Sequence, residues 1–488
     1  MNRDVIKSVA ASYVPRFVEF LTGPVSFIVI TKSLDRASYG SYHIILNMVC
    51  LSMPILTFGL AKYLHYAIPG EKIENQYRYF TNVLLTEVLL YVCAVMVILF
   101  PFRNYLARLL KFPLSPHWLW GAPLLWTGFI VEQRILLFLG LKKRLKLKAL
   151  LSTIEQILYV LLLLGVFVWS VRVGRIVAAR IISYFIILAI SLFFLKKRHL
   201  ARSRPDRALI LDAVKYSMPL ILVDTSLVVI QTIDRFMLSS IYSVNEVGLY
   251  SYGFQFLLMS YYLGSPLLWA IYPYFAESYR LKKKDKNRIF FFQFSLTLVI
   301  CAITSSGLVA DRGILVPLVS RKEYLEAGFT FNILLLYPVG ISAMYMYQQI
   351  LLLEKDTKII GIIFAASAVG NIILNALLIP RFAEKGAALA SIIAIWFMTA
   401  FFYNRCRRYD ISLFNGWIAR FLLFWVSWFG FLLLTRPLVT NVFRLCIIHT
   451  FAVIPLLLLF RVLNFKDLFR MIKTKGQMEN QISGSDEE

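Results

Sequence analysis

The sequence predicts an all-α polytopic membrane protein with about fourteen transmembrane helices. Its 488 residues are 59% hydrophobic and 16% charged, whereas about a quarter of the residues of a soluble protein are charged. Apolar runs of about 20 residues, the length that crosses the hydrocarbon core of a membrane, recur from one end to the other. The connections are short, so no soluble domain is inserted. Strands of a membrane β-barrel would instead be about 10 residues long with alternating polarity.

The first six predicted helices form an N-terminal half, residues 1–207. Charged connections such as LKKRLKLK (141–148) end one apolar run and precede the next, and KKRHLARSRPDR (196–207) closes this half. The apolar runs cover residues 9–31, 41–61, 80–101, 117–140, 149–170 and 174–195.

The next six predicted helices form a C-terminal half, residues 208–409, and two further helices lie within residues 410–465. RLKKKDKNR (280–288) and NRCRR (404–408) are the most basic connections of this part. Residues 466–488 form a polar cytoplasmic tail. The apolar runs cover residues 213–237, 247–273, 289–310, 328–353, 358–379, 386–404, 413–434 and 442–463.

Three pairs of matching motifs indicate that the two halves are a parallel repeat. A shift of six helices preserves orientation in the membrane, and secondary transporters are often built from such repeats, with substrate bound between them. The pairs are SYVP (12–15) with YSMP (216–219), Gly40-Ser-Tyr42 with Gly248-Leu-Tyr250, and GRIVAARIIS (174–183) with GAALASIIA (386–394).

The distribution of lysine and arginine predicts that both termini are cytoplasmic. An even number of helices places the termini on one side, and the most basic loops lie on that same side, as cytoplasmic loops do. This topology signal accounts for most of the net charge of +25, with attraction to anionic lipids as a by-product. No nucleic-acid partner is therefore expected.

Motifs of membrane enzymes and pumps are missing from the sequence. There is no G-x-x-x-x-G-K-[ST] phosphate loop, no H-E-x-x-H and no G-x-S-x-G. The five cysteines are scattered, without the spacing of a metal-binding pair. No enzyme activity, catalytic residue, metal site or cofactor is therefore predicted. A secondary transporter needs only helices, hinges and charges that face a cavity.

Charged and polar side chains inside the predicted helices are the candidate substrate-binding residues. A carboxylate at mid-bilayer costs about 3 kcal/mol even on the lenient insertion scale, so Asp224, near the middle of the seventh helix, is expected to face a cavity or a partner. Arg16 and Glu19 lie three residues apart, on one face of the first helix. The predicted set is Arg16, Glu19, Asn47, Arg134, Asp224 and Arg235, with Asp224 and Glu19 as candidates for coupling to a proton or a sodium ion.

Simpler structural roles stay open for several of these residues. Arg16 and Glu19 would pair with each other, or Arg16 would extend to the inner interface. Asp234 with Arg235 would end the seventh helix at the outer interface. Arg180 is placed near the outer end of the sixth helix and is left out of the predicted site.

Three stretches resemble a known family. IDRFMLSSIYSVNEVGLYSYGFQF (233–256), followed by SPLLWAIYPYFAE (265–277), resembles the seventh and eighth helices of bacterial polysaccharide-transport flippases. These are the O-antigen and exopolysaccharide flippases of the multidrug/oligosaccharidyl-lipid/polysaccharide exporter superfamily. NIILNALLIPRFAEKGAALASIIA (371–394) is similar to the family's eleventh and twelfth helices. LDRASYGSYHII (34–45) is similar to the family's first junction, but has Asp35 where glycine is usual.

The resemblance implies a substrate, a mechanism and a location. The substrate would be an undecaprenyl-diphosphate-linked oligosaccharide, moved from the inner to the outer leaflet of the bacterial cytoplasmic membrane by rocking of two halves in a V-shaped bundle. Arginine would bind the anionic diphosphate through its paired donors. A polysaccharide polymerase and a chain-length regulator would be partners, besides membrane lipids.

Two alternatives stay open at this point. A multidrug exporter of the same fold would move organic cations, and its cavity would favour carboxylates and aromatic rings over arginine. A membrane enzyme such as a glycan polymerase would need a large external loop, which this sequence lacks.

Overall fold

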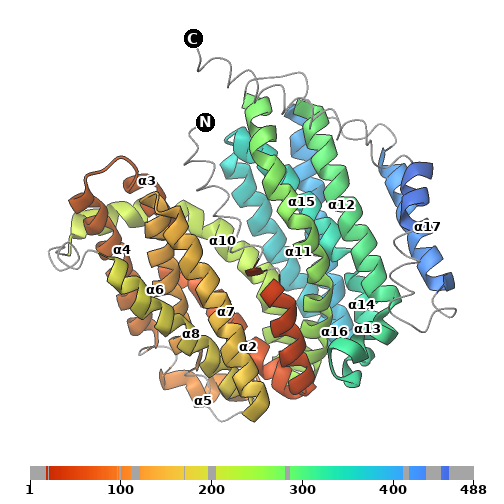
Figure 1. The fold of residues 1–488 in the computed structure, drawn as a ribbon, viewed down its shortest axis with the longest axis horizontal. Coiled ribbons are helices and arrows are strands. Elements are labelled where there is room, and N and C mark those ends of the chain that lie inside the picture. The colour runs from red at the N-terminus through yellow and green to blue at the C-terminus, as the bar shows by residue number, and fades with distance from the viewer. Residues whose placement is uncertain are drawn as a thin grey trace. The chain divides into compact units, whose positions relative to one another are not determined.

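The structure is a computed structural model in which every labelled element is a helix (Figure 1). The predicted all-α class is therefore confirmed for the part of the chain that the structure describes. That part comprises residues 18–19, 21–95, 97, 100–111, 121–169, 171–195, 205–280, 286–409, 417–435 and 452–460.

The apolar segments predicted from the sequence coincide with helices. Each segment from 41–61 to 413–434 overlaps one. Among the described residues, seven helices are long and apolar enough to cross a membrane, or nine if two bent pairs each count as one span. The protein is thus a multi-pass membrane protein. The number fourteen stays a prediction, because segments 9–31 and 442–463 lie partly outside the described residues.

One long helix, α16 (Thr357–Cys406), contains two of the predicted transmembrane segments. Ala383 interrupts it with φ 49° and ψ −129°, which is not helical. Gly386 follows, where a Cβ atom would lie only 2.4 Å from the carbonyl oxygen of Leu378. Only glycine permits this close approach of two backbones, so the sequence fixes a sharp turn between the two segments.

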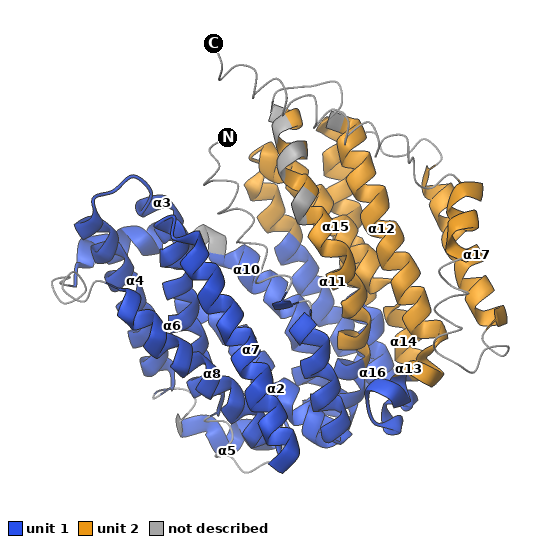
Figure 2. Cartoon of the chain, in the orientation of Figure 1, with its two compact units in different colours: residues 1–252, 316–327, 364–391 blue, residues 253–315, 328–363, 392–488 orange. Residues whose placement is uncertain are grey.

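The helices form two compact units (Figure 2). Unit 1 comprises residues 1–252, 316–327 and 364–391, and unit 2 comprises residues 253–315, 328–363 and 392–488. These boundaries are not those of the two predicted halves, since α16 has residues in both units. The division into repeats therefore stays a prediction.

Unit 1 is built around α6, α7 and α8, which pack against one another, with α2 against α6 and α10 (Figure 1). Stacked rings fill the core between α4 and α6, where the centroids of Phe80 and Phe138 lie 4.4 Å apart. The labelled helices that lie wholly in this unit are α2 (Arg36–Thr57), α3 (Ala61–Ala67), α4 (Ile73–Ala94), α5 (Phe100–Leu109), α6 (Gly121–Leu141), α7 (Leu145–Trp169), α8 (Val173–Phe194) and α10 (Arg207–Ile241).

The start of α10 is fixed by Asp206. Its Oδ1 atom accepts hydrogen bonds from the backbone N–H groups of Ala208 and Leu209, at 3.0 and 3.3 Å. Arg78 of α4 donates to its other oxygen. The backbone bond from Leu209 and the Arg78 guanidinium both favour the ionised carboxylate, so they hold the pKa of Asp206 below its ordinary value. This cap begins the helix on which Asp224 lies.

Helix α10 bends by 56° between its segments 207–218 and 221–241. Pro219 lies at the bend, and proline removes one backbone hydrogen bond of a helix. Asp224 follows soon after the bend, near the beginning of the second segment. Asp224 lies near the middle of Arg207–Ile241 as a whole, and its depth in the membrane stays a prediction.

The two glycines that mark the predicted repeat contact each other. A Cβ on Gly40 would lie 2.0 Å from the carbonyl oxygen of Val244, and a Cβ on Gly248 would lie 2.1 Å from that of Arg36. Val244 precedes Gly248 by the same interval as Arg36 precedes Gly40. The contact between α2 and the first turns of α11 (Val244–Arg280) is therefore reciprocal, as a duplicated helix pair would make it.

Unit 2 places α12 against α15 and α17. The indole N–H of Trp425 donates to Ser306 Oγ at 2.8 Å, which joins α17 to α12. The remaining elements of the chain are α12 (Lys286–Ala310), α13 (Arg312–Val319), the 3₁₀-helix η3 (Lys322–Ala327), α14 (Gly328–Leu334), α15 (Tyr337–Leu353), the 3₁₀-helix η4 (Arg407–Tyr409) and α17 (Trp417–Thr435).

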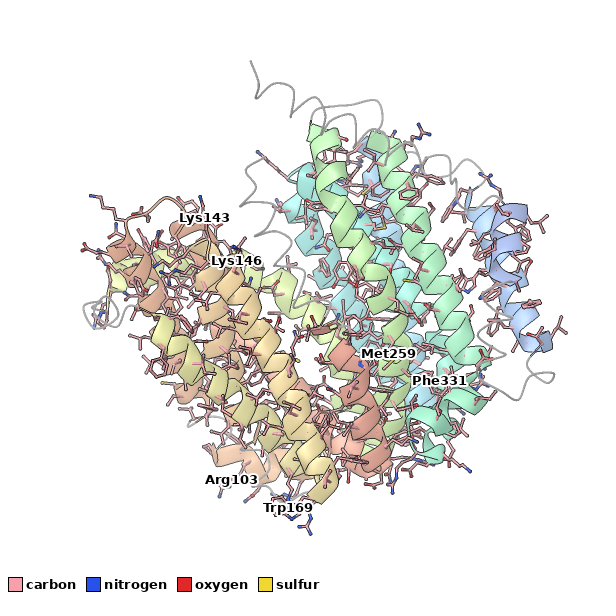
Figure 3. All side chains as sticks on the ribbon, in the orientation of Figure 1. Arg103, Lys143, Lys146, Trp169, Met259 and Phe331 are labelled. Atoms are coloured by element: carbon pink, nitrogen blue, oxygen red, sulfur yellow. The ribbon has the colours of Figure 1, made fainter. Side chains whose placement is uncertain are left out.

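Charged residues from the predicted inner and outer loops lie at opposite ends of unit 1. Figure 3 shows Lys143 and Lys146, at the turn between α6 and α7, at one end of these helices, and Arg103 and Trp169 at the other end. The alternation of loops predicted for this part of the chain is therefore present in the structure.

Candidate functional site

Three of the predicted site residues belong to the first two predicted helices. Arg16 lies outside the described residues. Glu19 is exposed, and it is near enough to Glu155 of α7 for the two charges to interact. Asn47 of α2 is buried, and its Nδ2 atom has no hydrogen-bond partner. The roles of these three residues stay predictions.

Asp224 forms an ion pair with Lys62 of α3. Lys62 Nζ lies 2.8 Å from Asp224 Oδ2, and the two side chains are 35% and 43% exposed. An ion pair exposed to this degree is only weakly stabilising. Its exposure distinguishes this pair from the buried ones of the unit.

Tyrosine rings border the same contact between α3 and α10. Tyr66 and Tyr216 stack with ring centroids 5.2 Å apart, and both are exposed. Beside them, the hydroxyl of Tyr63 donates to Asp212 Oδ2 at 3.0 Å. Lys62 and Tyr66 are four residues apart on α3, so they lie on one face of that helix. This face combines one cation, one carboxylate and two exposed aromatic rings.

Arg134 is held by Glu87 inside unit 1. Its Nε and Nη2 atoms donate to the two carboxylate oxygens of Glu87, at 2.7 and 3.0 Å. Both residues are buried. This paired geometry is the strongest form of an arginine–carboxylate contact, so Arg134, a predicted substrate-binding residue, joins α6 to α4 in the structure.

A second charged group joins α7 and α8. Arg180 Nη1 lies 2.9 Å from Glu155 Oε1, and its Nε donates to the hydroxyl of Tyr184 at 3.0 Å. The guanidinium also lies over the ring of Tyr159, 4.2 Å from its centroid. Arg180, which the sequence analysis left out of the predicted site, is thus held by side chains of α7 and α8, and its depth in the membrane stays a prediction.

Arg235 and Asp234 are buried together near the end of α10. Arg235 Nη1 lies 3.1 Å from Asp234 Oδ1, and Arg235 Nε donates to Ser251 Oγ at 3.2 Å. Tyr250 donates to Asp234 Oδ2, and Ser391 donates to the same atom at 3.3 Å. Side chains of α10, α11 and α16 thus enclose the pair, and α10 continues beyond it to Ile241.

In the part of the chain that the structure describes, the predicted site residues do not form one cluster but several separate groups. Arg134 and Arg235 have different carboxylate partners, and Asp224 pairs with a residue that the sequence analysis did not select. Lys62 was missed because it directly follows the apolar run 41–61, where a lysine is expected at an interface. Within the described ranges, no cluster of three or more His, Cys, Asp or Glu residues could hold a metal ion.

A comparison with family models identifies the chain. Residues 5–279, more than half of its length, match the model of the polysaccharide biosynthesis protein family. The chain belongs to this family. A search among curated proteins found no match. The matched residues of this family member include the buried charges described above and the Lys62–Asp224 pair.

Solved structures establish the fold of this family member. The lipid II flippase MurJ, in an inward closed conformation, is 14% identical with a TM-score of 0.70, covering 95% of this chain and 100% of that chain. A multidrug resistance MATE family transporter of the MOP superfamily, in an inward-facing conformation, is 13% identical with a TM-score of 0.64, covering 82% and 97%. A MOP superfamily transporter from Pyrococcus furiosus is 11% identical with a TM-score of 0.55, covering 84% and 96%. The chain therefore has the fold shared by these transporters.

Proposed function

We propose that this protein is a flippase for a polyprenyl-diphosphate-linked oligosaccharide. It moves repeat units, linked to undecaprenyl diphosphate, from the inner to the outer leaflet of the bacterial cytoplasmic membrane by alternating access. These units serve O-antigen, capsule or exopolysaccharide synthesis. The observation that carries the proposal is the match of residues 5–279 to the polysaccharide biosynthesis family. The likeness of the whole fold to a lipid II flippase supports it.

The Lys62–Asp224 pair is the contact that we assign to the substrate headgroup. Lysine is a compact cation that binds phosphate as a point charge. Because the pair is partly exposed, a diphosphate can displace Asp224 without leaving a buried charge unpaired. The exposed rings of Tyr66 and Tyr216 offer apolar faces with a polar edge, which suits the alternating apolar and hydroxyl surfaces of a sugar.

The other residues of the predicted set have two kinds of role in this proposal. Arg16, Glu19 and Asn47 contact the substrate as it passes, and Arg134 and Arg235 act through the helices that they join. An inside-negative potential favours outward movement of an anion by about 2.3 kcal/mol per charge for each 100 mV. Coupling to a proton or a sodium ion through Asp224 or Glu19 completes the proposal.

The proposed setting follows from the same function. Both termini lie in the cytoplasm, and a polysaccharide polymerase and a chain-length regulator act on the flipped product. The protein itself breaks no covalent bond, uses no resident cofactor and binds no nucleic acid.

Depletion of the protein in its host tests the function directly. Lipid-linked sugars are extracted from the membranes and identified by mass spectrometry. We expect a single undecaprenyl-diphosphate repeat unit to accumulate on the cytoplasmic leaflet. An unchanged set of lipid-linked sugars after depletion would contradict the proposal.

Replacement of Lys62 tests the assigned headgroup contact. We expect Lys62→Ala to lower glycan export at least tenfold at equal protein level, because the diphosphate loses its cation. Lys146→Ala removes an exposed lysine from the same end of unit 1 and serves as the matched control, with export unchanged. Equal export by both variants would remove Lys62 from the site.

A multidrug exporter is the second candidate, favoured by the likeness to the MATE family transporter. That function would move organic cations. Deletion would then raise sensitivity to cationic dyes and leave lipid-linked sugars unchanged, so a drug panel beside the lipid extraction separates the two functions.

A further inference from the structure

Among the described residues, the charged side chains that α4, α6, α7 and α8 bring together do not balance. Two guanidinium groups, Arg134 and Arg180, lie among three carboxylates, Glu87, Glu132 and Glu155. The bidentate pair with Glu87 occupies Arg134. The ion pair with Glu155 and the bond to Tyr184 occupy Arg180. One carboxylate, Glu132, is therefore in excess.

Glu132 is almost fully removed from solvent. Its side chain on α6 is 1% exposed, and its Oε2 atom has no hydrogen-bond partner. A buried carboxylate that is ionised and without a partner is far less stable than a neutral carboxyl group, so such a group takes up a proton. Glu132 lies two residues before Arg134, and thus on a different side of α6 from the Arg134–Glu87 contact.

The groups that act on Glu132 come from two neighbouring helices. The charge of Glu155 on α7 opposes ionisation of Glu132, and that of Arg180 on α8 favours it. Tyr184 of α8 interacts with it as well.

On the other helices packed against α6, the following titratable groups have partners other than Glu132. On α2, Tyr42 interacts with Tyr159 and Arg180. On α4, Glu87 is bound by Arg134. On α3, Lys62 pairs with Asp224, and His65 lies near Lys148.

We propose that Glu132 is a further proton-binding residue, besides Asp224 or Glu19, and that it couples transport to the proton gradient. The proposal rests on the proposed transport function, and it assigns the coupling role to a residue that the sequence analysis did not select. A proton, and not a metal ion, fits the site, because no cluster of three or more metal-binding side chains is present among the described residues. Buried carboxylates within membrane helices are typical of proton relays.

Binding and release of the proton change how Arg180 is shared. While Glu132 is protonated, Arg180 belongs to Glu155, as the 2.9 Å contact has it. Loss of the proton leaves two carboxylates on α6 and α7 competing for one guanidinium on α8, and the three helices adjust together. Glu155 also responds to the charge of Glu19, so the change reaches the first helix, where the sequence predicts substrate contacts.

Infrared difference spectroscopy on the purified full-length protein tests the proposal without any substrate. The spectrum of the protein at mildly acidic pH is compared with that at alkaline pH, in choline chloride. We expect the carbonyl band of a buried, protonated carboxyl group to disappear as pH rises, and this band to be missing from Glu132→Gln. Glu155→Gln should also lose the band, because Arg180 then pairs with Glu132 and keeps it ionised.

Glu326→Gln is the control, since Glu326 pairs with Arg36 away from these helices, and it should keep the band. Persistence of the full band in Glu132→Gln, or its absence from the wild type, would overturn the assignment. Loss of the band on exchange of choline for sodium at constant pH would also overturn it, because sodium would then occupy the site. Lipid extraction reports on the transport function separately, so a protein that lacks the band and still exports glycan refutes the proton site alone.

Discussion

Single residues in unit 1 carry charge in two different settings. Arg134 and Glu87 are enclosed among helices, whereas Lys62 and Asp224 are partly exposed. Burial makes the first pair a structural element, because either partner alone would be an uncompensated charge in an apolar region. Exposure lets the second pair separate at small cost, because water can solvate either charge. The two pairs therefore respond differently to substitution.

Breaking the enclosed pair should destabilise the protein strongly. We expect Arg134→Met to lower the free energy of unfolding by about 3–5 kcal/mol, since Glu87 is left buried without a partner. The double variant Glu87→Gln with Arg134→Met should recover part of this loss. Denaturant unfolding of the purified protein in detergent measures both, with exposed Arg108→Met as the control. A double variant no more stable than Arg134→Met would refute this account.

The sequence identified the charged residues of the helices but not their partners. Arg134, Asp224 and Arg235 could be selected because charge in an apolar run is expensive. Their partners depend on which helices pack together, and residues distant along the chain carry no local signal of that. Arg180 shows the same limit, because nothing near it in the sequence indicates that Glu155 is its partner.

The sequence predicts the helices of this protein more accurately than the contacts between their side chains. The apolar runs predicted the helices, and the turn at Ala383 lies between the runs 358–379 and 386–404 as expected. The bend of α10 is the main departure. Pro219 belongs to the YSMP motif of the seventh helix, but a helical start at Arg207 was not predicted, because the charges of Arg207 and Asp212 interrupt the apolar run there.

The crossing of α2 and α11 depends on having no side chain at either glycine. We expect Gly248→Ala and Gly40→Ala each to lower the thermal unfolding midpoint, because the new Cβ would meet a backbone carbonyl oxygen. Gly165→Ala is the matched control, since that glycine of α7 has nothing within 4 Å. Alanine there should stabilise the helix by about 0.5–1 kcal/mol. A Gly248→Ala protein as stable as the Gly165→Ala protein would mean that the crossing is looser than described.

The whole molecule has an orientation in the membrane that the charges of its loops predict. Lys146 and Trp169 lie at opposite ends of unit 1 (Figure 3), and both are exposed. The positive-inside rule assigns the lysine-rich end to the cytoplasm. Each of the two residues therefore reports on one side of the membrane.

Cysteine labelling checks this orientation. The five native cysteines are first replaced by serine. We expect an impermeant maleimide to label Trp169→Cys in intact cells, and Lys146→Cys only in inverted vesicles, because the reagent cannot cross the membrane. The parent protein without cysteine is the control. Labelling of Lys146→Cys in intact cells would reverse the predicted topology and, with it, the direction of the proposed transport.

The reciprocal contact between Gly40 and Gly248 has a consequence for the ancestry of the chain. A surface that meets a shifted copy of itself, position for position, is self-complementary, and such surfaces are the ones that two-fold homodimers use. A half-length ancestor that carried this glycine would have paired with a second copy of itself in the membrane. Fusion of the two genes would then have preserved an interface that already existed between separate subunits.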